Sequence, residues 1–117
     1  MNELIETIFA GFTVDNTVIP VIFKYYEGHG EPYVIYSQVD ADASFSGDDG
    51  LIGYVDYYDF DVYSKGNYLQ IIERIKQLLE QNHFTWQPSR SSGDMYDTET
   101  GYYHKTLNFG YLKETEG

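Results

Sequence analysis

The sequence predicts an α+β fold: an antiparallel or mixed β-sheet of about five strands, with a short N-terminal helix and one long amphipathic helix packed on one face. Two observations predict this class. Apolar residues alternate with period 2 in several stretches, and between them one stretch changes to the 3.6-residue period of a helix. The length of 117 residues suits one domain over 1–117, and without cysteine the fold depends on packing alone.

The N-terminal stretch "NELIETIFAGF", residues 2–12, predicts a short helix. Its apolar residues recur at helical spacing. Glu3 and Glu6 lie in the first turn, where the helix dipole favours negative charge. We expect this helix to end at Gly11.

Three strands are predicted next, over about residues 18–26, 33–40 and 53–63. Pro20 cannot donate a backbone hydrogen bond, so the first strand is expected to begin there or to lie at a sheet edge. The polar stretch "EGHGEP" separates the first two strands as a turn. Three strands in succession predict an antiparallel meander.

The third of these strands, "YVDYYDFDVY", carries different side chains on its two faces, because neighbours in a strand point to opposite sides. The even-numbered face is the better candidate for the core and carries Tyr54, Asp56, Tyr58, Phe60 and Val62. The odd-numbered face carries Val55, Tyr57, Asp59, Asp61 and Tyr63.

The stretch "YLQIIERIKQLLEQN" predicts an amphipathic helix over about residues 67–82. Its apolar side chains form one stripe at helical spacing, and we expect Ile72, Ile75 and Leu79 to pack on the sheet. After it, "FTWQP" predicts a short strand and "YYHKTLNFGYL" a final strand.

The polar loop of about residues 89–101, between those last two strands, is longer than most loops in compact domains. Such loops are commonly functional or disordered. This one contains Arg90, Met95 and Tyr96, residue types that are enriched at protein interfaces. The hypothesis is a docking element that is mobile in the free protein, and the alternative is a mobile hairpin tip without a role.

The charge balance excludes one class of partner. Nineteen acidic residues against seven basic ones give a formal net charge of −12. Binding to a phosphate backbone depends on lysine and arginine, so this balance argues against ordinary nucleic-acid binding.

The sequence also lacks both a run of about 18 apolar residues and a secretory signal, so we expect a soluble, intracellular protein without membrane contact.

Metal binding receives little support from the sequence. The stretch "DADASFSGDDGL" lacks the glycine and glutamate that an EF-hand loop needs at its sixth and twelfth positions. Asp59 and Asp61 share a strand face and could hold a hard divalent ion, to which Asp48 and Asp49 could add if the fold brings them near. Without a third fixed ligand, we expect no metal site.

Catalysis receives no support either. The sequence contains no nucleophile elbow, no pair of histidines at helical spacing and no glycine-rich phosphate loop. Paired carboxylates for glycoside hydrolysis stay formally open, because a sequence gives no separation between them. We therefore expect a protein that is not an enzyme and uses no cofactor.

The chain resembles a known family over nearly its whole length, in its order of elements and in three stretches, "IPVIFKYYEGHGEPYVIY", "YDFDVYSKGNY" and "PSRSSGDMYDTETGYYHKTLNF". It resembles the tail-terminator and head-to-tail joining proteins of long-tailed bacteriophages, the superfamily of the lambda minor tail protein U. The three stretches are similar to small minor structural proteins from phages and prophages of low-GC Gram-positive bacteria.

This resemblance implies a structural subunit of the virion, assembled in the bacterial cytoplasm. The implied partners are other copies of the chain in a hexameric ring, the tail-tube protein and the head-tail connector. Genomic DNA would pass through the ring unbound, for which an acidic lumen is suited. On this account Tyr57, Asp59, Asp61 and Tyr63 face a neighbouring subunit or the channel, while Arg90, Met95 and Tyr96 dock on a partner.

Two alternatives stay open. A neck or tail-completion protein of the same fold would act on the connector side. From a different class, a monomeric β-rich domain could bind a small aromatic or sugar ligand in a tyrosine-lined pocket.

Overall fold

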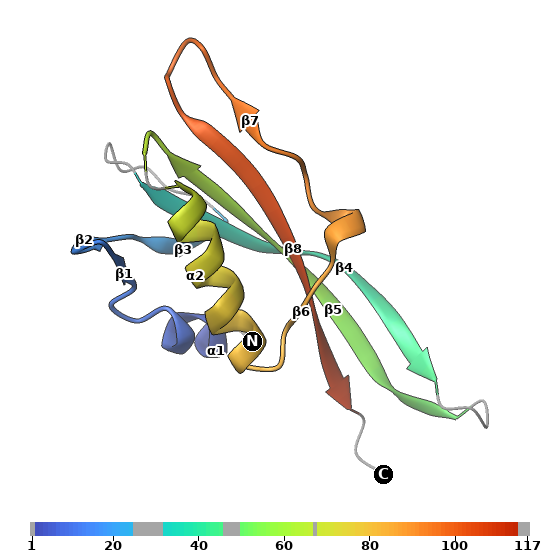
Figure 1. The fold of residues 1–117 in the computed structure, drawn as a ribbon. Coiled ribbons are helices and arrows are strands. Elements are labelled where there is room, and N and C mark those ends of the chain that lie inside the picture. The colour runs from blue at the N-terminus through green and yellow to red at the C-terminus, as the bar shows by residue number, and fades with distance from the viewer. Residues whose placement is uncertain (1, 25–31, 46–49, 67, 115–117) are drawn as a thin grey trace.

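The computed structural model describes residues 2–24, 32–45, 50–66 and 68–114 (Figure 1). These residues form a mixed α+β fold with a six-stranded main sheet and a small separate hairpin. In chain order the elements are α1 (Asn2–Ile8), β1 (Thr13–Val14), β2 (Thr17–Val18), β3 (Val21–Phe23), β4 (Tyr33–Phe45), β5 (Leu51–Ser64), α2 (Tyr68–Gln81), β6 (Thr85–Trp86), the 3-10 helix η1 (Pro88–Arg90), β7 (Met95–Tyr96) and β8 (Tyr103–Glu114).

The main sheet has the strand order β3-β4-β5-β8-β6, and β7 also pairs with β8. Its centre is antiparallel and consists of β4, β5 and β8, which are 13, 14 and 12 residues long. Since β5 occupies one edge of β8, the short strands β6 and β7 follow one another along the other edge.

The predicted antiparallel meander is wrong for its first strand. β3 pairs with β4 in parallel, with Val21 opposite Val34 and Phe23 opposite Tyr36. Directly after β3, Lys24 has a φ of 63°, and its N–H donates to the carbonyl of Tyr36. Alternation of apolar residues specifies which face of a strand is buried but not its direction, so the pattern could not distinguish a parallel from an antiparallel pair.

A short hairpin, β1 with β2, was not predicted. Its two turn residues, Asp15 and Asn16, have φ values of 51° and 64°. Positive φ at both positions is typical of the type I′ turn, which matches the twist of two-residue hairpins. The hairpin takes up the start of the predicted strand 18–26, and β3 begins right after Pro20, as predicted.

The first helix is shorter than predicted, whereas the second agrees with the predicted range of about 67–82. α1 ends at Ile8, and the chain turns through Gly11, which has a φ of 67°. α2 has 14 residues, an ordinary length rather than a long one. It ends in a Schellman motif: Phe84 N–H donates to the carbonyl of Leu79 at 3.0 Å, and His83 takes the left-handed conformation with a φ of 71°.

The core lies between the helices and one face of the sheet. α2 buries the predicted Ile72, Ile75 and Leu79 together with Tyr68 and Ile71. α1 contributes the fully buried Ile5, and Phe9, directly after α1, has its ring 5.9 Å from that of Phe60 on β5, so both helices cover the same face (Figure 1).

The even-numbered face of β5 belongs to this core, as predicted, with one exception. Tyr58, Phe60 and Val62 are at most 1% exposed, and Asp56 is 7% exposed. Tyr54 is the exception at 47%, because the helices do not reach that end of the strand. Lys113 Nζ lies 2.8 Å from the carboxylate of Asp56 and compensates its burial.

The sheet extends past the helices as a three-stranded arm (Figure 1). We define this sheet arm as residues 40–45 of β4, 51–57 of β5 and 110–114 of β8. A β-bulge at Val39 precedes it, where the register between β4 and β5 shifts. Val39, Tyr54 and Leu112 are 49%, 47% and 41% exposed. The molecule measures 51 × 27 × 23 Å.

No helix in the described parts of the chain has the length and apolar character needed to cross a bilayer.

Candidate interaction surface

The side of the sheet opposite the helices, which we call the open face, carries the four β5 residues predicted to contact a partner. They are Tyr57, Asp59, Asp61 and Tyr63, and each is half-buried. The register with β8 places Gly110, Asn108, Thr106 and His104 opposite them in that order. The structure therefore brings all four onto one surface.

Both carboxylates of this row accept hydrogen bonds from neutral side chains on β8. Asn108 Nδ2 donates to Asp59 at 2.8 Å, and Thr106 Oγ1 donates to Asp61 at 2.5 Å. Asp61 also lies 3.3 Å from His104 Nε2. Asp61 therefore lies between the Thr106 hydroxyl and the His104 ring.

Over the residues that the structure describes, no group of three or more histidine, aspartate or glutamate side chains is placed to hold a metal ion. Asp48 and Asp49, the further ligands considered from the sequence, lie outside those residues.

At one end of the open face, aromatic rings stack across three strands. The Tyr63 ring lies between those of Tyr33 and His104, with centroid distances of 4.8 and 4.2 Å and nearly parallel planes. Burial raises the pKa of the Tyr63 hydroxyl, and Asp61 and then Tyr33 raise it further. Tyr63 therefore stays a neutral phenol at physiological pH.

At the other end, Arg90 from η1 covers Tyr57. Its guanidinium carbon lies 3.8 Å from the Tyr57 ring centroid, and its nitrogens lie 3.0 Å from Asp40 and 3.4 Å from Asp42 on β4. The hydrogen bond from Arg90 is the main cause that lowers the pKa of Asp40. Two predicted interface residues from different parts of the sequence are thus in contact, and Arg90 is engaged within its own chain.

The segment 89–101 is largely a loop, as predicted, but it includes the end of η1 and the short strand β7, and it runs along β8. Ser91 Oγ accepts hydrogen bonds from the Asn108 N–H and from Trp86 Nε1, at 3.0 and 3.1 Å. Ser92 Oγ accepts from the Thr106 N–H at 2.9 Å, and the Ser92 N–H donates back to the Thr106 carbonyl. The two hydroxyls replace strand carbonyls where η1 interrupts the pairing.

The three residues proposed for docking do not form one surface. Met95 pairs with His104 and Tyr96 with Tyr103, so their side chains lie on opposite faces of the sheet. Met95 and Tyr96 are 42% and 54% exposed. Tyr96 lies on the helix side, where its ring is 4.8 Å from that of Tyr103, while Arg90 lies over the open face.

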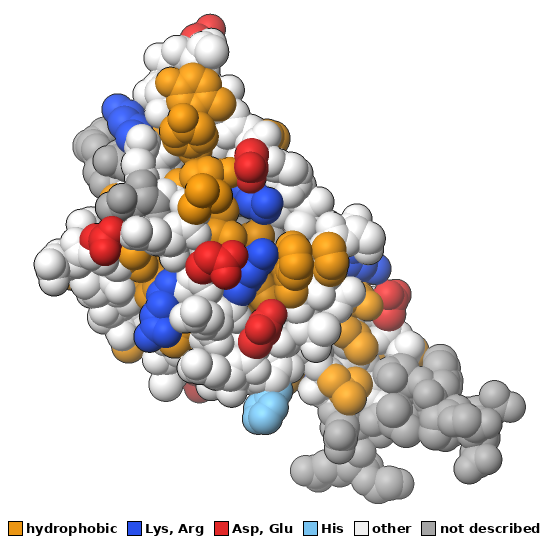
Figure 2. Space-filling view, viewed as in Figure 1, with side chains coloured by type: hydrophobic (Ala, Val, Ile, Leu, Met, Phe, Trp, Pro, Cys, Tyr) orange, Lys and Arg blue, Asp and Glu red, His pale blue; other side chains and the backbone are white. Residues whose placement is uncertain are grey.

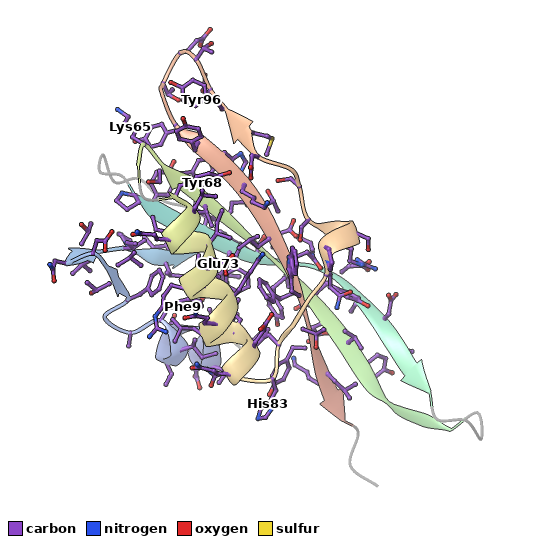
Figure 3. All side chains as sticks on the ribbon, in the orientation of Figure 1. Phe9, Lys65, Tyr68, Glu73, His83 and Tyr96 are labelled. Atoms are coloured by element: carbon purple, nitrogen blue, oxygen red, sulfur yellow. The ribbon has the colours of Figure 1, made fainter. Side chains whose placement is uncertain are left out.

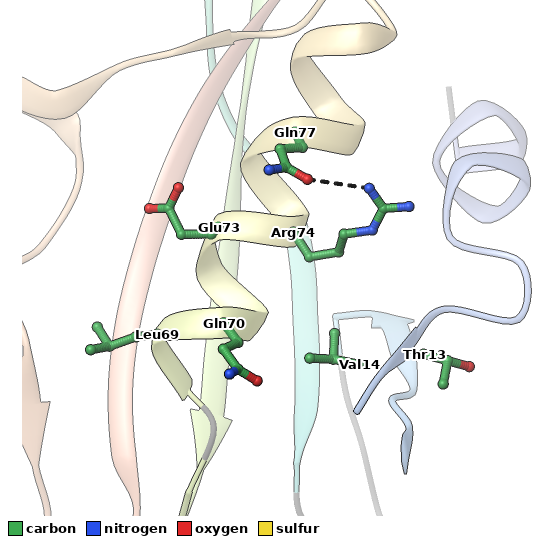
Figure 4. A pocket seen from close by; sticks show the side chains of 7 residues that line it. All are labelled: Thr13, Val14, Leu69, Gln70, Glu73, Arg74 and Gln77. Carbon is green, nitrogen blue, oxygen red and sulfur yellow. Dashed lines mark hydrogen bonds between the residues drawn. The ribbon is translucent and has the colours of Figure 1, made fainter. Parts of the chain in front are cut away.

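A second surface, on the helix side, was not predicted. Leu69 on α2 is 66% exposed, and a hollow of about 390 Å³ lies along the outer side of α2 between Leu69 and Val14 of β1 (Figure 4). A neighbouring hollow of about 350 Å³ lies between Leu69 and Tyr103. Apolar side chains gather above and beside α2 in the space-filling view (Figure 2).

This helix-side surface consists of Val14, Leu69, Tyr96 and Tyr103, with polar residues of α2 along its rim. Among the rim residues, Arg74 donates a hydrogen bond to Gln77 at 3.2 Å (Figure 4). Figure 3 shows Tyr96 near the tip of the β7–β8 hairpin and Glu73 on the outer side of α2. The signal in the sequence was that Leu69 falls outside the apolar stripe of its helix.

No model of a known protein family matches this chain, and no curated protein matches it at a significant level.

Proposed function

We propose that this chain is a structural subunit of a phage or prophage virion, which forms a ring, expected to be hexameric, on the end of the tail tube and joins the tube to the head connector. The observation that best supports the proposal is a pair of chemically different surfaces on opposite faces of one sheet. One is the apolar helix-side surface around Leu69, and the other is the open face of paired carboxylates and stacked rings.

Two unlike surfaces suit a head-to-tail contact. In a two-fold dimer the same patch meets itself, whereas in a ring one patch of each subunit meets a different patch of the next. A ring subunit also needs surfaces for the partners above and below it. The sheet arm carries exposed apolar side chains for such contacts, Tyr54 on the helix-side face and Leu112 on the open face.

The net charge of −12 agrees with the proposed role. A channel through which DNA slides is best served by a surface that does not hold phosphates through lysine or arginine. The basic residues Arg90, Lys105 and Lys113 each lie within 3.2 Å of an aspartate of the same chain. They are therefore partly neutralised within the subunit.

The test is assembly on purified tail tubes. The protein should cap tube ends as a ring in negative-stain images, and a Leu69→Glu variant should lose this while keeping its melting temperature. Gln81→Glu is the matched control, because it places the same residue on an exposed position of α2 away from the hollow. Tubes left uncapped by the folded wild-type protein would contradict the proposal.

The choice between a tail terminator and a completion protein on the connector side depends on the first partner bound. Co-sedimentation of the chain with tail tubes alone and with connectors alone separates the two. A tail terminator should bind tubes without connector. A completion protein should bind connectors without tubes.

A further inference from the structure

The sheet arm has two strand edges that no described strand covers. On the outer side of β4, the pairing with β3 ends at Tyr36, so β5 is the only described strand beside residues 40–45. On the outer side of β8, the pairing with β6 ends at Gly110, so β5 is the only described strand beside residues 111–114. In the described chain, the arm therefore presents two rows of backbone N–H and C=O groups that pair with no strand.

On β4 the outward backbone groups belong to Ala41 and Ala43. The Ala41 N–H donates to the side chain of its neighbour Asp40 at 2.8 Å, so it points away from β5. Backbone direction alternates along an antiparallel strand, and the groups of Ala43 therefore point the same way. Both alanine side chains are exposed, on the face of the sheet that carries the helices. An approaching strand thus meets no large side chain at these two positions.

On β8 an outward position in the arm is Leu112. The Asn108 carbonyl accepts a hydrogen bond from the Gln87 N–H, which lies beyond the outer edge of β8. Even-numbered residues of β8 therefore point their backbone groups away from β5, and Leu112 follows by the same alternation. Its side chain is on the open face, in register with Val55. The outward groups of the two edges thus belong to residues whose side chains are on opposite faces of the sheet.

This difference in face fits a parallel pairing between the two edges. In a parallel pair, an outward residue bonds to the two residues that flank its opposite number on the partner strand. Leu112 of one copy then bonds to Ala41 and Ala43 of the next copy. Asp42 lies directly opposite Leu112, and both side chains are on the open face. The two sheets therefore join with like faces on the same side.

Charge disfavours the pairing of β4 with a second β4. If Ala41 lies opposite Ala43 of a second β4 in an antiparallel pair, the two Asp42 side chains lie opposite each other. Each is 57% exposed, and like charges in directly opposite positions destabilise a strand pair. In the parallel pairing with β8, Asp42 lies opposite Leu112 instead. Lys113 then lies opposite Ala43, so no like charges meet at these positions.

We propose that copies of this chain join through their sheet arms, with the β8 edge of one copy parallel to the β4 edge of the next. β4 and β8 run in the same direction, because both are antiparallel to β5, and rotation about a ring axis preserves that direction. The arm and Tyr96 lie at opposite ends of the molecule, so this contact adds to that of the helix-side surface (Figures 1 and 3). The inference names a contact within the proposed ring, and it rests on the proposed function for closure of that ring.

The sequence contains no cysteine, which permits a cross-linking test. The double variant Asp42→Cys with Leu112→Cys places both thiols in register with Val55, on either side of β5. Within one chain they are about 10 Å apart, beyond the roughly 7 Å that a disulfide spans. Between copies in the proposed register they are about 5 Å apart. Oxidation at physiological salt should give a ladder of covalent oligomers, and a double variant that stays monomeric would overturn the proposal.

Two control variants test the register. Ala43→Cys with Leu112→Cys moves one thiol by one position to the other face, and should cross-link at least tenfold more slowly. Equal rates would mean chance collisions and would overturn the proposal. Asp42→Cys alone should also cross-link slowly. If it formed dimers as fast as the double variant, β4 would pair with β4, and the proposed pairing with β8 would be wrong.

A proline variant tests the backbone hydrogen bond itself. Ala43→Pro removes an N–H that faces away from β5, and proline is tolerated at the edge of a sheet. The melting temperature should stay close to that of wild type, while cross-linking between Cys at positions 42 and 112 should fall at least tenfold. Ala43→Thr keeps the N–H and is the matched control. A folded Ala43→Pro variant that cross-links as fast as the Ala43→Thr variant would overturn the proposal.

Oxidation in the presence of tail tubes separates this inference from the proposed function. Tubes that are capped by the double variant without disulfides between copies would overturn the pairing and leave the proposed function standing. Cross-linked copies that leave the tubes uncapped would support the pairing and contradict the proposed function.

Discussion

Arg90 lies over the ring of Tyr57, 3.8 Å from its centroid, and connects η1 to the open face of the sheet. The contact also includes Asp40 and Asp42 on β4, so three separate segments meet at one guanidinium. The residues that follow Arg90 run beside β8. The contact of Arg90 with Tyr57 therefore fixes the position of the segment 88–96 on the sheet.

Replacing Arg90 by alanine should lower the melting temperature at neutral pH, and raising the salt concentration should reduce the difference from wild type, because the ion pairs are exposed and screened. Arg74→Gln is the control, since the described contact of Arg74 is a hydrogen bond to Gln77. Thermal unfolding followed by circular dichroism measures both. An unchanged melting temperature for Arg90→Ala would show that the contact contributes nothing to stability.

The same variant has a predictable pH dependence. The folded-state pKa of Asp40 is below its ordinary value of 3.8, so its contribution to stability is present above that pH and is lost as the pH falls through the folded-state pKa. The difference in stability between wild type and Arg90→Ala should therefore be constant from pH 7 to about 5 and should shrink below pH 3.8. Urea unfolding across this range checks it, and a difference that grows in acid would contradict the assignment.

Gly110→Ala should destabilise the protein through crowding beneath Arg90. A Cβ at Gly110 would lie 3.1 Å from Val55 Cγ1 and 3.3 Å from both Tyr57 Cε1 and Gln87 Nε2. Overpacking of this kind costs about 1–3 kcal/mol. Gly93→Ala is the control, because a Cβ there meets no atom within 4 Å. Equal unfolding free energies for the two variants would show that the contacts around Gly110 relax freely.

Ser91→Ala should cost about 1–3 kcal/mol, because it leaves the Trp86 Nε1–H and the Asn108 N–H without their acceptor. The tryptophan fluorescence of the folded protein should shift as well, since Trp86 is the single tryptophan. Ser89→Ala, an exposed hydroxyl in η1, is the matched control and should have little effect. Identical denaturation curves for both variants would contradict a structural role for the Ser91 hydroxyl.

Ile75→Asp should unfold the domain. Ile75 is fully buried, and an unpaired charge at this position costs several kcal/mol against a total stability of about 5–15 kcal/mol. Gln77→Asp on the exposed side of α2 should leave a cooperative thermal transition. A soluble Ile75→Asp variant that melts cooperatively would show that the apolar stripe of α2 does not face the core.

The sequence predicted the elements whose periodicity is strong. The stripe of α2 and the two faces of β5 follow from spacing alone, because burial repeats at 3.6 residues in a helix and at 2 in a strand. The I′ turn at Asp15 and Asn16 could also have been found, since two turn-forming residues separate short β-branched pairs.

Other features depend on contacts that no local pattern specifies. Whether β3 runs parallel to β4 is decided by how the chain returns, not by its alternation. The bond of Ser91 to Asn108 and the contact of Arg90 with Tyr57 each join segments far apart in sequence. Leu69 falls outside the apolar stripe of α2 in the sequence, but its 66% exposure depends on how the described chain packs around the helix.

We propose that copies of this chain form a closed ring through unlike surfaces. Acidic subunits repel one another. At 0.01 M salt this repulsion is little screened, because the Debye length is about 30 Å. The most direct measurement is sedimentation velocity of the purified protein from low to physiological salt, with and without tail tubes. We predict a monomer at low salt, and a ring that higher salt or added tubes favour and that Leu69→Glu prevents. A wild-type protein that stays monomeric throughout, free or with tubes, would contradict the claim.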